Sequence, residues 1–220
     1  RLIARYRVAG DWQLGAFTPR PRAPRSSLMS VQIHQSAINN TLEQLVPRDH
    51  AMAIDEVIRQ AASTFGYEAE LTDEIPADVT VQFAKTRPIT IEIEDGRLWV
   101  TMRIVTMKRG RGLKLHRFIV RAPYKPTADG TRAMLVRDGH LSISGPGMSV
   151  RQRLPIRAVF NKVLSPNQPI SLTLPALYDH PAMDNLAISQ MDLRAGWLGV
   201  AISDSQAEKL AWDVDAEIRR

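Results

Sequence analysis

The chain has 220 residues, of which 44% are hydrophobic and 24% are charged, and its formal net charge is +6. These proportions are typical of a folded protein with one sizeable hydrophobic core. Because the chain has no cysteine, disulfide bonds, thiol catalysis and thiolate metal sites are excluded.

The chain begins with Arg1 rather than with methionine, so we expect a mature product or a piece of a longer protein. Residues 1–17 contain strand-like pieces, and Pro19 to Arg25 alternates proline with arginine. Proline cannot donate a backbone hydrogen bond and favours an extended conformation. We therefore predict N-terminal strands and a linker over residues 1–25, continuing from a longer parent chain, and a single domain over residues 26–220.

The first part of this domain is predicted to form a short strand and two helices. Residues 29–33 alternate apolar and polar side chains, and Ser36 is a suitable N-cap for a helix that ends before Pro47. A second helix is predicted from about Ala51 to Gly66. Both helices have apolar side chains at helical spacing and are expected to cover a sheet.

Two asparagines, Asn39 and Asn40, lie inside the first predicted helix, where side-chain amides compete with the backbone. One interpretation is that one of them ties the helix to an adjacent strand or loop through a buried hydrogen bond. The other is polar recognition at the mouth of a pocket.

The clearest pattern in the sequence is a predicted β-hairpin over residues 89–104, with Asp95-Gly96 as a two-residue turn. A register set by this turn places six apolar residues on one face: Ile93 opposite Leu98, Ile91 opposite Val100 and Ile89 opposite Met102. A slip of one residue would turn this apolar set toward water, so the pattern and the turn select the same register.

The same device predicts two further hairpins. A turn at Asp138-Gly139 would place Val136 opposite Leu141 and Met134 opposite Ile143, and a turn at Ala195-Gly196 would place Leu193 opposite Leu198 and Met191 opposite Val200. In the strand over residues 113–122, Leu115 and Phe118 are out of phase, which predicts a bulge near His116 or Arg117.

Between the second and third hairpins, Gly145-Pro146-Gly147 is typical of a tight turn, although it also resembles a loop that offers N–H groups to a phosphate. Pro155 is expected in the first turn of an amphipathic helix that ends near Leu164. Ser205 is expected to cap a short last helix. The order of elements predicts an α+β fold, in which a mainly antiparallel sheet of hairpins packs against two early helices and this later one.

The positive charge is concentrated over residues 103–125, which contain no acidic residue. We expect an anion-binding patch there, formed by Lys108, Arg109, Arg111, Lys114 and Arg117. Such a patch could meet an anionic surface or nucleic acid. The alternative is that basic side chains keep an exposed sheet edge soluble. We do not expect nucleic-acid binding, because the nearby aromatic residues form no stacking motif.

Catalytic and metal-binding motifs are missing from the sequence. The five histidines show no metal-ligand spacing, so we predict no metal site and no cofactor. The nearest approach to an acid–base pair is Asp179-His180, beside Tyr178, because a neighbouring carboxylate can raise the pKa of an imidazole. A hydrolase with an unrecognised site at Asp179 and His180 is therefore kept as an alternative function.

Three segments resemble uncharacterised large envelope-associated proteins of bacteria: residues 18–40, Gln82-Phe83-Ala84 and Gly196-Trp197-Leu198-Gly199. The resemblance implies a location in the cell envelope or periplasm and a position in the C-terminal part of a longer protein. It supplies no catalytic residues.

A second resemblance, over residues 30–39, is to the tubular lipid-binding proteins, in which a curved antiparallel sheet wraps a helix around an apolar tunnel. It implies that an apolar or lipid-like ligand would be lined by Ile89, Ile91, Ile93, Leu98, Val100 and Met102. The alternative is that these residues pack against the helices. We therefore expect a non-catalytic structural or binding module of the envelope.

Overall fold

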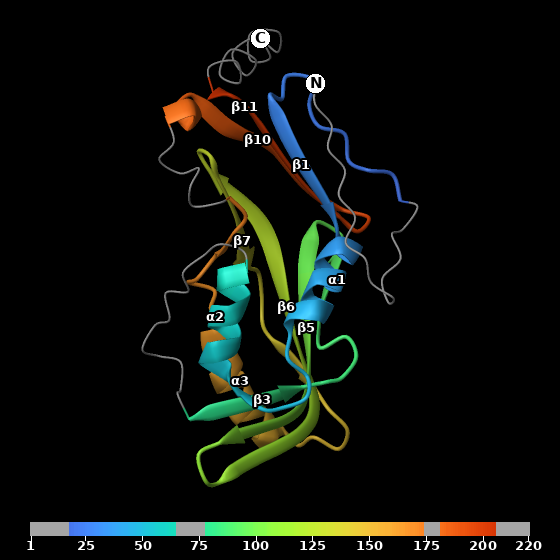
Figure 1. Cartoon of the computed structure of the whole chain (residues 1–220), viewed down its shortest axis with the longest axis vertical. Helices are drawn as coiled ribbons and strands as arrows, with labels where there is room; N and C mark the ends of the chain where they lie inside the picture. The colour runs from blue at the N-terminus through green and yellow to red at the C-terminus, as the bar shows by residue number, and fades with distance from the viewer. Residues whose placement is uncertain (1–17, 65–77, 174–180, 206–220) are drawn as a thin grey trace.

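The computed structural model describes residues 18–64, 78–173 and 181–205, which form three helices and two antiparallel sheets (Figure 1). The helices are α1 (Gln35–Leu45), α2 (Ile54–Thr64) and α3 (Val150–Val163). A short 3-10 helix, η2, covers Pro181–Met183. Within these ranges no helix is both long enough and apolar enough to span a membrane.

The larger sheet is built around the long β5–β6 hairpin. Its strands are β2 (Met52–Ala53), β3 (Val79–Phe83), β4 (Ile89–Glu94), β5 (Arg97–Arg109), β6 (Leu113–Asp129), β7 (Arg132–Arg137), β8 (Ser142–Ser144) and β9 (Ile170–Ser171). They follow the order β2-β3-β5-β6-β7-β9, while β4 also pairs with β5 and β8 also pairs with β6. The sheet curls into a half-barrel, which confirms the predicted α+β fold with a curved antiparallel sheet (Figure 1).

The smaller sheet contains β1 (Met29–His34), β11 (Trp197–Asp204) and β10 (Leu186–Arg194), in that order. Two backbone hydrogen bonds join β10 to the larger sheet. The N–H of Gly96 donates to the carbonyl of Leu193 (3.2 Å), and the N–H of Ile188 donates to the carbonyl of Gly130 (2.9 Å). The smaller sheet therefore rests on two hairpin turns, at the opposite end of the long axis from the β5–β6 turn (Figure 1).

Two of the predicted hairpins are confirmed in register. Strands β4 and β5 pair from Ile89 with Met102 to Glu94 with Arg97, around Asp95 (φ 52°) and Gly96 (φ 71°). Strands β10 and β11 turn at Ala195-Gly196, with Leu193 opposite Leu198 and Met191 opposite Val200. Both central residues of each turn have positive φ, which is the backbone of a type I′ turn.

The predicted hairpin at Asp138-Gly139 is wrong. Strands β7 and β8 both pair with β6 rather than with each other, so that Met134 lies opposite Thr127 and Ile143 lies opposite Val120. The physical reason is the length of β6, whose edge away from β5 pairs with β7 over residues 124–129 and with β8 over residues 119–121. Gly130 (φ 56°) begins a turn that folds β7 back onto this edge before Asp138 is reached.

The predicted irregularity in β6 is found at Arg117, but it is not a bulge. Leu115 and Phe118 are both buried, as their phase requires, yet the β5–β6 register continues unbroken on either side of Arg117. The phase changes because the backbone of Arg117 adopts a left-handed conformation (φ 47°). The register shift lies instead between β3 and β5, at Gln82 and Phe83.

All three helix starts differ from the predictions. Helix α1 begins at Gln35 and is capped by His34 rather than by Ser36, because the His34 side chain accepts from the N–H of Ser36. Helix α2 begins at Ile54 rather than near Ala51, because Met52 and Ala53 pair with β3 as a short strand. Helix α3 begins five residues before Pro155, because Ser149 caps it. The Ser149 side chain accepts from the N–H of Gln152, whose own side chain accepts from the N–H of Ser149.

Helix α1 closes the free edge of β4 with side-chain amides. The Asn39 side chain donates to the carbonyl of Ile91 (2.9 Å) and accepts from its N–H (2.6 Å), and the Gln35 side chain accepts from the N–H of Ile93 (2.7 Å). Asn39 thus bonds as a neighbouring strand would. This confirms the prediction that one asparagine of the pair ties the helix to a strand.

The same stripe continues to Glu43, whose carboxylate accepts from the N–H of Arg87 (3.0 Å). Gln35, Asn39 and Glu43 are four residues apart on the helix, a rise of about 6 Å. Alternate residues of a strand are separated by roughly 6.6 Å. This near match explains how Gln35 and Asn39 bond to Ile93 and Ile91, which are alternate residues of β4. Glu43 bonds instead to Arg87, in the segment before β4.

Replacing Asn39 with leucine should lower the free energy of unfolding by about 2–4 kcal/mol, because both backbone groups of Ile91 would lose their buried partner. Urea denaturation followed by circular dichroism measures this loss. The control is Arg153→Ala on the exposed side of α3, which should change stability by no more than about 0.5 kcal/mol. Equal effects of the two substitutions would contradict the edge-capping role.

Candidate apolar groove

The smaller sheet carries an apolar face that is open at β1. Met29, Val31 and Ile33 alternate along β1 with exposed fractions of 46%, 50% and 39%. The register places apolar residues beside them on the two neighbouring strands: Ile202, Val200 and Leu198 on β11, then Ile188, Met191 and Leu193 on β10. We call this nine-residue face and the hollow in front of it the groove.

One end of the groove is continuous with the hydrophobic core. Leu193 and Leu198 are buried and belong to the same cluster as Ile93 and Leu98 of the larger sheet, and Val200 packs against that cluster. Exposure increases across the sheet from these residues to β1. The groove is therefore an extension of the core surface that the described part of the chain leaves open.

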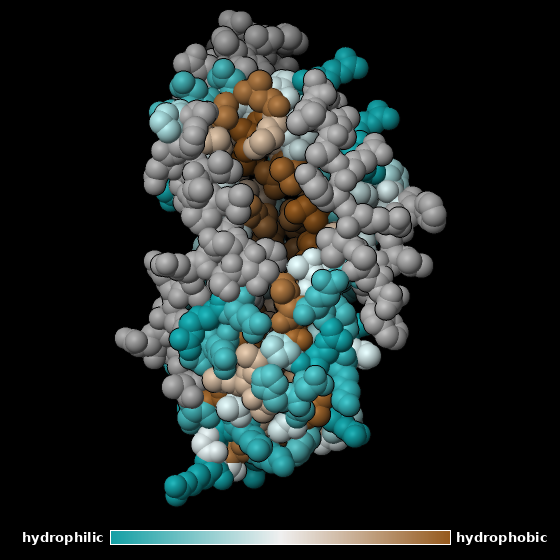
Figure 2. Space-filling view, in the orientation of Figure 1, coloured by the Kyte–Doolittle hydropathy of each residue, from teal (hydrophilic) through white to brown (hydrophobic). Residues whose placement is uncertain are grey.

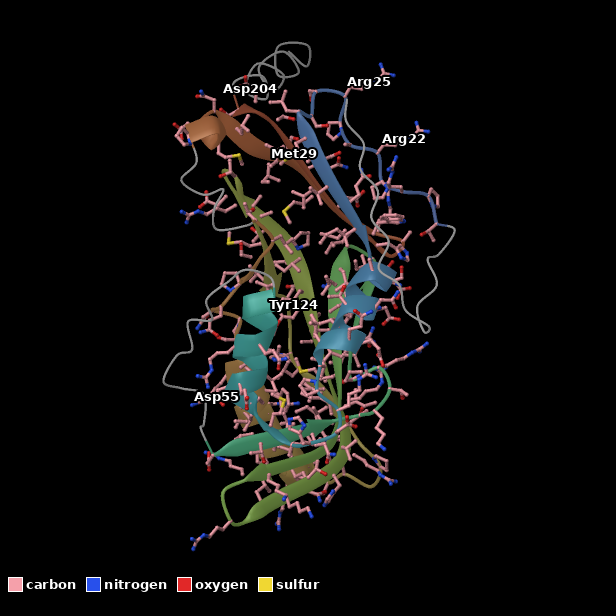
Figure 3. The ribbon with its side chains drawn as sticks, in the orientation of Figure 1. Arg22, Arg25, Met29, Asp55, Tyr124 and Asp204 are labelled. Carbon is pink, nitrogen blue, oxygen red and sulfur yellow. The ribbon has the colours of Figure 1, made fainter. Side chains whose placement is uncertain are left out.

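The space-filling view shows this extension directly. A hollowed hydrophobic strip runs down the upper half of the molecule, below the smaller sheet (Figure 2). Met29 lies on β1 at the upper end, and Tyr124 of β6 lies about half-way along the molecule (Figure 3). Tyr124 is buried, and burial raises the pKa of its hydroxyl to about 12, so it stays neutral at physiological pH.

A neutral histidine lies where β1 passes into α1. The Nδ1 atom of His34 accepts from the N–H of Ser36 (3.2 Å), and its ring packs edge-to-face on Trp197 with centroids 4.9 Å apart. Burial lowers the pKa of His34 below its ordinary value. The indole N–H of Trp197 donates to the hydroxyl of Thr18 (3.1 Å). The junction thus places no charge beside the apolar face.

The proline-rich segment lies against the other side of the smaller sheet. Pro21 is buried, its carbonyl accepts from the side chain of Gln32 (2.9 Å), and a Cβ on Gly199 would lie 3.7 Å from its ring. These contacts attach the described part of the predicted linker to β1 and β11. The division of the chain at residue 25 stays a prediction.

The residues predicted to line a ligand lie deeper than the groove. Four of them are buried in the core, namely Ile91, Ile93, Leu98 and Val100, while Ile89 and Met102 are partly buried against it. Ile38 and Leu42 of α1 pack against the same cluster. Their role in contacting a ligand stays a prediction. The exposed face of β1 was missed because alternation in a short strand does not indicate which neighbour covers it.

The five residues predicted to bind anions are brought together by the β5–β6 hairpin and are all exposed: Lys108, Arg109, Arg111, Lys114 and Arg117. Lys108 lies directly opposite Lys114 in the register. Arg109 makes a long ion pair of 3.7 Å with Asp78. We call these five residues the basic end. It lies at the opposite end of the molecule from the smaller sheet (Figure 1).

The remaining sequence candidates give no site in the described part of the chain. Asp179 and His180 lie outside the described residues, so the hydrolase alternative stays a prediction. No group of histidine and acidic side chains in residues 18–64, 78–173 and 181–205 is arranged to hold a metal ion. Gly145-Pro146-Gly147 forms a turn in which the N–H of Met148 donates to the carbonyl of Gly145 (3.3 Å).

Comparison of the chain with protein families, with curated proteins and with solved structures found no match. The functional argument therefore depends on the geometry of the groove and of the basic end.

Gly196 should tolerate alanine less well than the equivalent Gly96. Both have positive φ, but a Cβ on Gly196 would lie 2.7 Å from Nε2 of His34, whereas a Cβ on Gly96 would meet nothing within 4 Å. Gly96→Ala should cost about 1 kcal/mol from backbone strain alone. Gly196→Ala should cost clearly more in the same urea denaturation experiment. A smaller loss for Gly196→Ala would show that His34 is not fixed at this position.

Lowering the pH should destabilise the protein through His34. The unfolded chain binds a proton at the ordinary pKa of 6.5, whereas burial keeps the folded imidazole neutral to lower pH. The contribution is therefore complete above pH 6.5 and decreases as the pH falls below it. In thermal melts from pH 7.5 to 5.5, His34→Asn should show a shallower decrease than the unmodified protein, since asparagine still caps α1. Parallel curves would contradict this assignment.

Proposed function

We propose that the chain is a non-catalytic binding module of the bacterial cell envelope, which holds an apolar, lipid-like molecule in the groove. The observation that supports the proposal is the open apolar face of Met29, Val31 and Ile33, which continues the core surface without a break. An exposed face of this kind on a folded domain is typical of a ligand or partner site.

The shape and chemistry of the groove favour a hydrocarbon chain. From Met29 to Ile33 the strand advances about 13 Å, and the hydrophobic strip continues from there down the upper half of the molecule (Figure 2). Neutral Tyr124 lies in the core below and supplies no charge to pair with a buried head group. A charged head group would therefore remain at the rim, in water, while the apolar chain lies along β1.

The energy available is in the range of a reversible complex. Full burial of one aliphatic side chain contributes about 1.5–3 kcal/mol. Covering the exposed half of three such side chains would therefore contribute about 2–4 kcal/mol. Contacts with the partly buried Ile188, Val200 and Met191 would add to this.

The location in the envelope is supported by the resemblance of residues 18–40, together with Gln82-Phe83-Ala84 and Gly196-Trp197-Leu198-Gly199, to large envelope-associated proteins. The non-catalytic assignment is supported by the sequence, which lacks a nucleophile elbow and any metal-ligand motif.

Val31→Asp should abolish binding of an apolar ligand, because a carboxylate in the middle of the strip would lose its hydration when the ligand covers it. Titration with NBD-labelled phosphatidylcholine, whose head group has no net charge, should show at least about a tenfold weaker affinity. The matched control is Ile170→Asp on β9, an isoleucine that is 42% exposed and lies outside the groove, which should bind as the unmodified protein does.

Native mass spectrometry of the purified protein tests the occupant independently. The expected result is one chain carrying a lipid-sized adduct that is lost in the Val31→Asp variant. A mass equal to two chains without an adduct would mean that the groove is a dimer interface. Unchanged phospholipid binding by Val31→Asp would refute the groove as the site.

A further inference from the structure

The strands that carry the basic end have almost no acidic side chains of their own, and the ion pair from Arg109 to Asp78 reaches outside them. The sequence contains no aspartate or glutamate between Gly96 and Ala128, or between Gly139 and Tyr178. The first of these ranges covers all of β5 and nearly all of β6, and the second covers β8 and α3. The positive charge of the basic end is therefore not neutralised by its own strands.

Two lysines of the basic end face each other without compensation. Lys108 and Lys114 are directly opposite in the antiparallel register, so their side chains lie on the same face. Like charges in such a pair destabilise a sheet. No ion pair of either lysine is found in the described part of the chain. Such an arrangement suits a surface whose counter-charge comes from another molecule.

An open apolar pocket lies beside these residues, where β5 and β6 change phase. It has a volume of about 530 Å³, and its lining includes Ile104, Phe118, Ile119 and Pro146. Two guanidinium-bearing residues, Arg103 and Arg117, also line it. Arg117 holds the left-handed backbone conformation (φ 47°), a strain of the kind that clusters at binding sites. The pocket thus combines an apolar floor with positive charge.

Exposed aliphatic side chains are also present on α3, the helix that follows the loop lining the pocket. The loop that lines the pocket leads within four residues to Val150, which is 71% exposed, and Leu154, one helical turn later, is 61% exposed. Arg151, Arg153 and Arg157 on the same helix are exposed as well. Protruding aliphatic residues among arginines are typical of surfaces that enter the interfacial region of a bilayer.

We propose that this end of the molecule docks on a bilayer of anionic lipids. The five residues of the basic end, Arg117 among them, contact the phosphates of the head groups. Val150 and Leu154 enter the interfacial region of the bilayer. The aliphatic residues favour a membrane over single-stranded nucleic acid, because surfaces that bind single strands use exposed aromatic side chains for stacking. Here Phe118 is buried, and Arg121 covers the ring of Trp99 at 4.2 Å. Docking does not depend on the groove, which lies toward the other end (Figure 2).

Sedimentation with vesicles tests the proposal on the whole chain. The protein should bind mixed vesicles of phosphatidylglycerol and phosphatidylcholine. Its affinity for pure phosphatidylcholine vesicles should be at least about tenfold lower, because each basic residue gains binding energy from the anionic surface. Raising the salt concentration from 50 to 500 mM should release most of the bound protein.

Lys114→Glu separates docking from folding. The new carboxylate would lie opposite Lys108 and replace repulsion with an ion pair, so the melting temperature should not decrease. The partition coefficient on anionic vesicles should nevertheless decrease about tenfold or more, since two units of charge are lost. The control is Arg22→Glu, the same charge change at an exposed residue near the other end of the molecule (Figure 3), which should bind nearly unchanged.

Leu154→Ser tests the apolar part, and it should weaken vesicle binding by a factor that persists at high salt. Equal losses in Arg22→Glu and Lys114→Glu would overturn the proposal, because only net charge would then matter. Equal binding to neutral and anionic vesicles would overturn it too, as would tighter binding to a DNA or RNA duplex than to anionic vesicles at the same ionic strength. The Val31→Asp variant should still dock, so failure of the groove and failure of the docking surface are distinguishable.

Discussion

The stripe of side chains that joins α1 to the edge of β4 is the constraint on which the arrangement of the two sheets depends. Gln35 has the central part in it, because its side chain accepts from the N–H of Ile93 in the larger sheet and its own N–H donates to the carbonyl of Gly196 in the smaller one. No residue separates β1 from α1. Fixing the helix on β4 therefore also fixes the angle at which β1 presents its apolar face.

This constraint leaves β1 as the edge of the smaller sheet, with Val31 half exposed. An apolar edge strand is a liability, since it can pair with another chain and aggregate. Protection is visible at the corresponding edge of β4, where Asn39 and Gln35 occupy the backbone groups. The backbone edge of β4 is covered by buried side-chain amides, whereas the apolar side chains of β1 remain exposed. This contrast makes the open face of β1 more informative than a single exposed leucine elsewhere on the surface.

Local features such as turns and the tie between α1 and β4 could be predicted from the sequence. The choice among competing strand partners could not. Asp95-Gly96 set the register of β4 and β5 correctly, because a two-residue turn and a one-sided apolar pattern agree. The turn at Asp138-Gly139 had the same sequence pattern, but β6 is long enough to pair with both β7 and β8. How far a strand extends along a partner distant in sequence is not encoded in any local pattern. Asn39 was predicted to tie its helix to a neighbour for the right reason. The exposure of Met29 depends on which of the described elements lie over β1, and no pattern within residues 29–33 encodes that.

In β5 and β6 the alternation of buried and exposed side chains shifts by one residue part-way along the hairpin. This shift allows the long hairpin to keep apolar side chains in the core on both sides of Arg117. Ile104 lies opposite Phe118 and Met107 lies opposite Leu115, and all four are buried. Both strands therefore change phase at the same place. An inserted residue in one strand would have moved every later side chain of that strand to the other face. The left-handed backbone of Arg117 changes the phase without an insertion, so the register beyond it survives and Lys108 remains opposite Lys114. The strain at Arg117 thus keeps the basic side chains outside and the core residues inside on both sides of this residue.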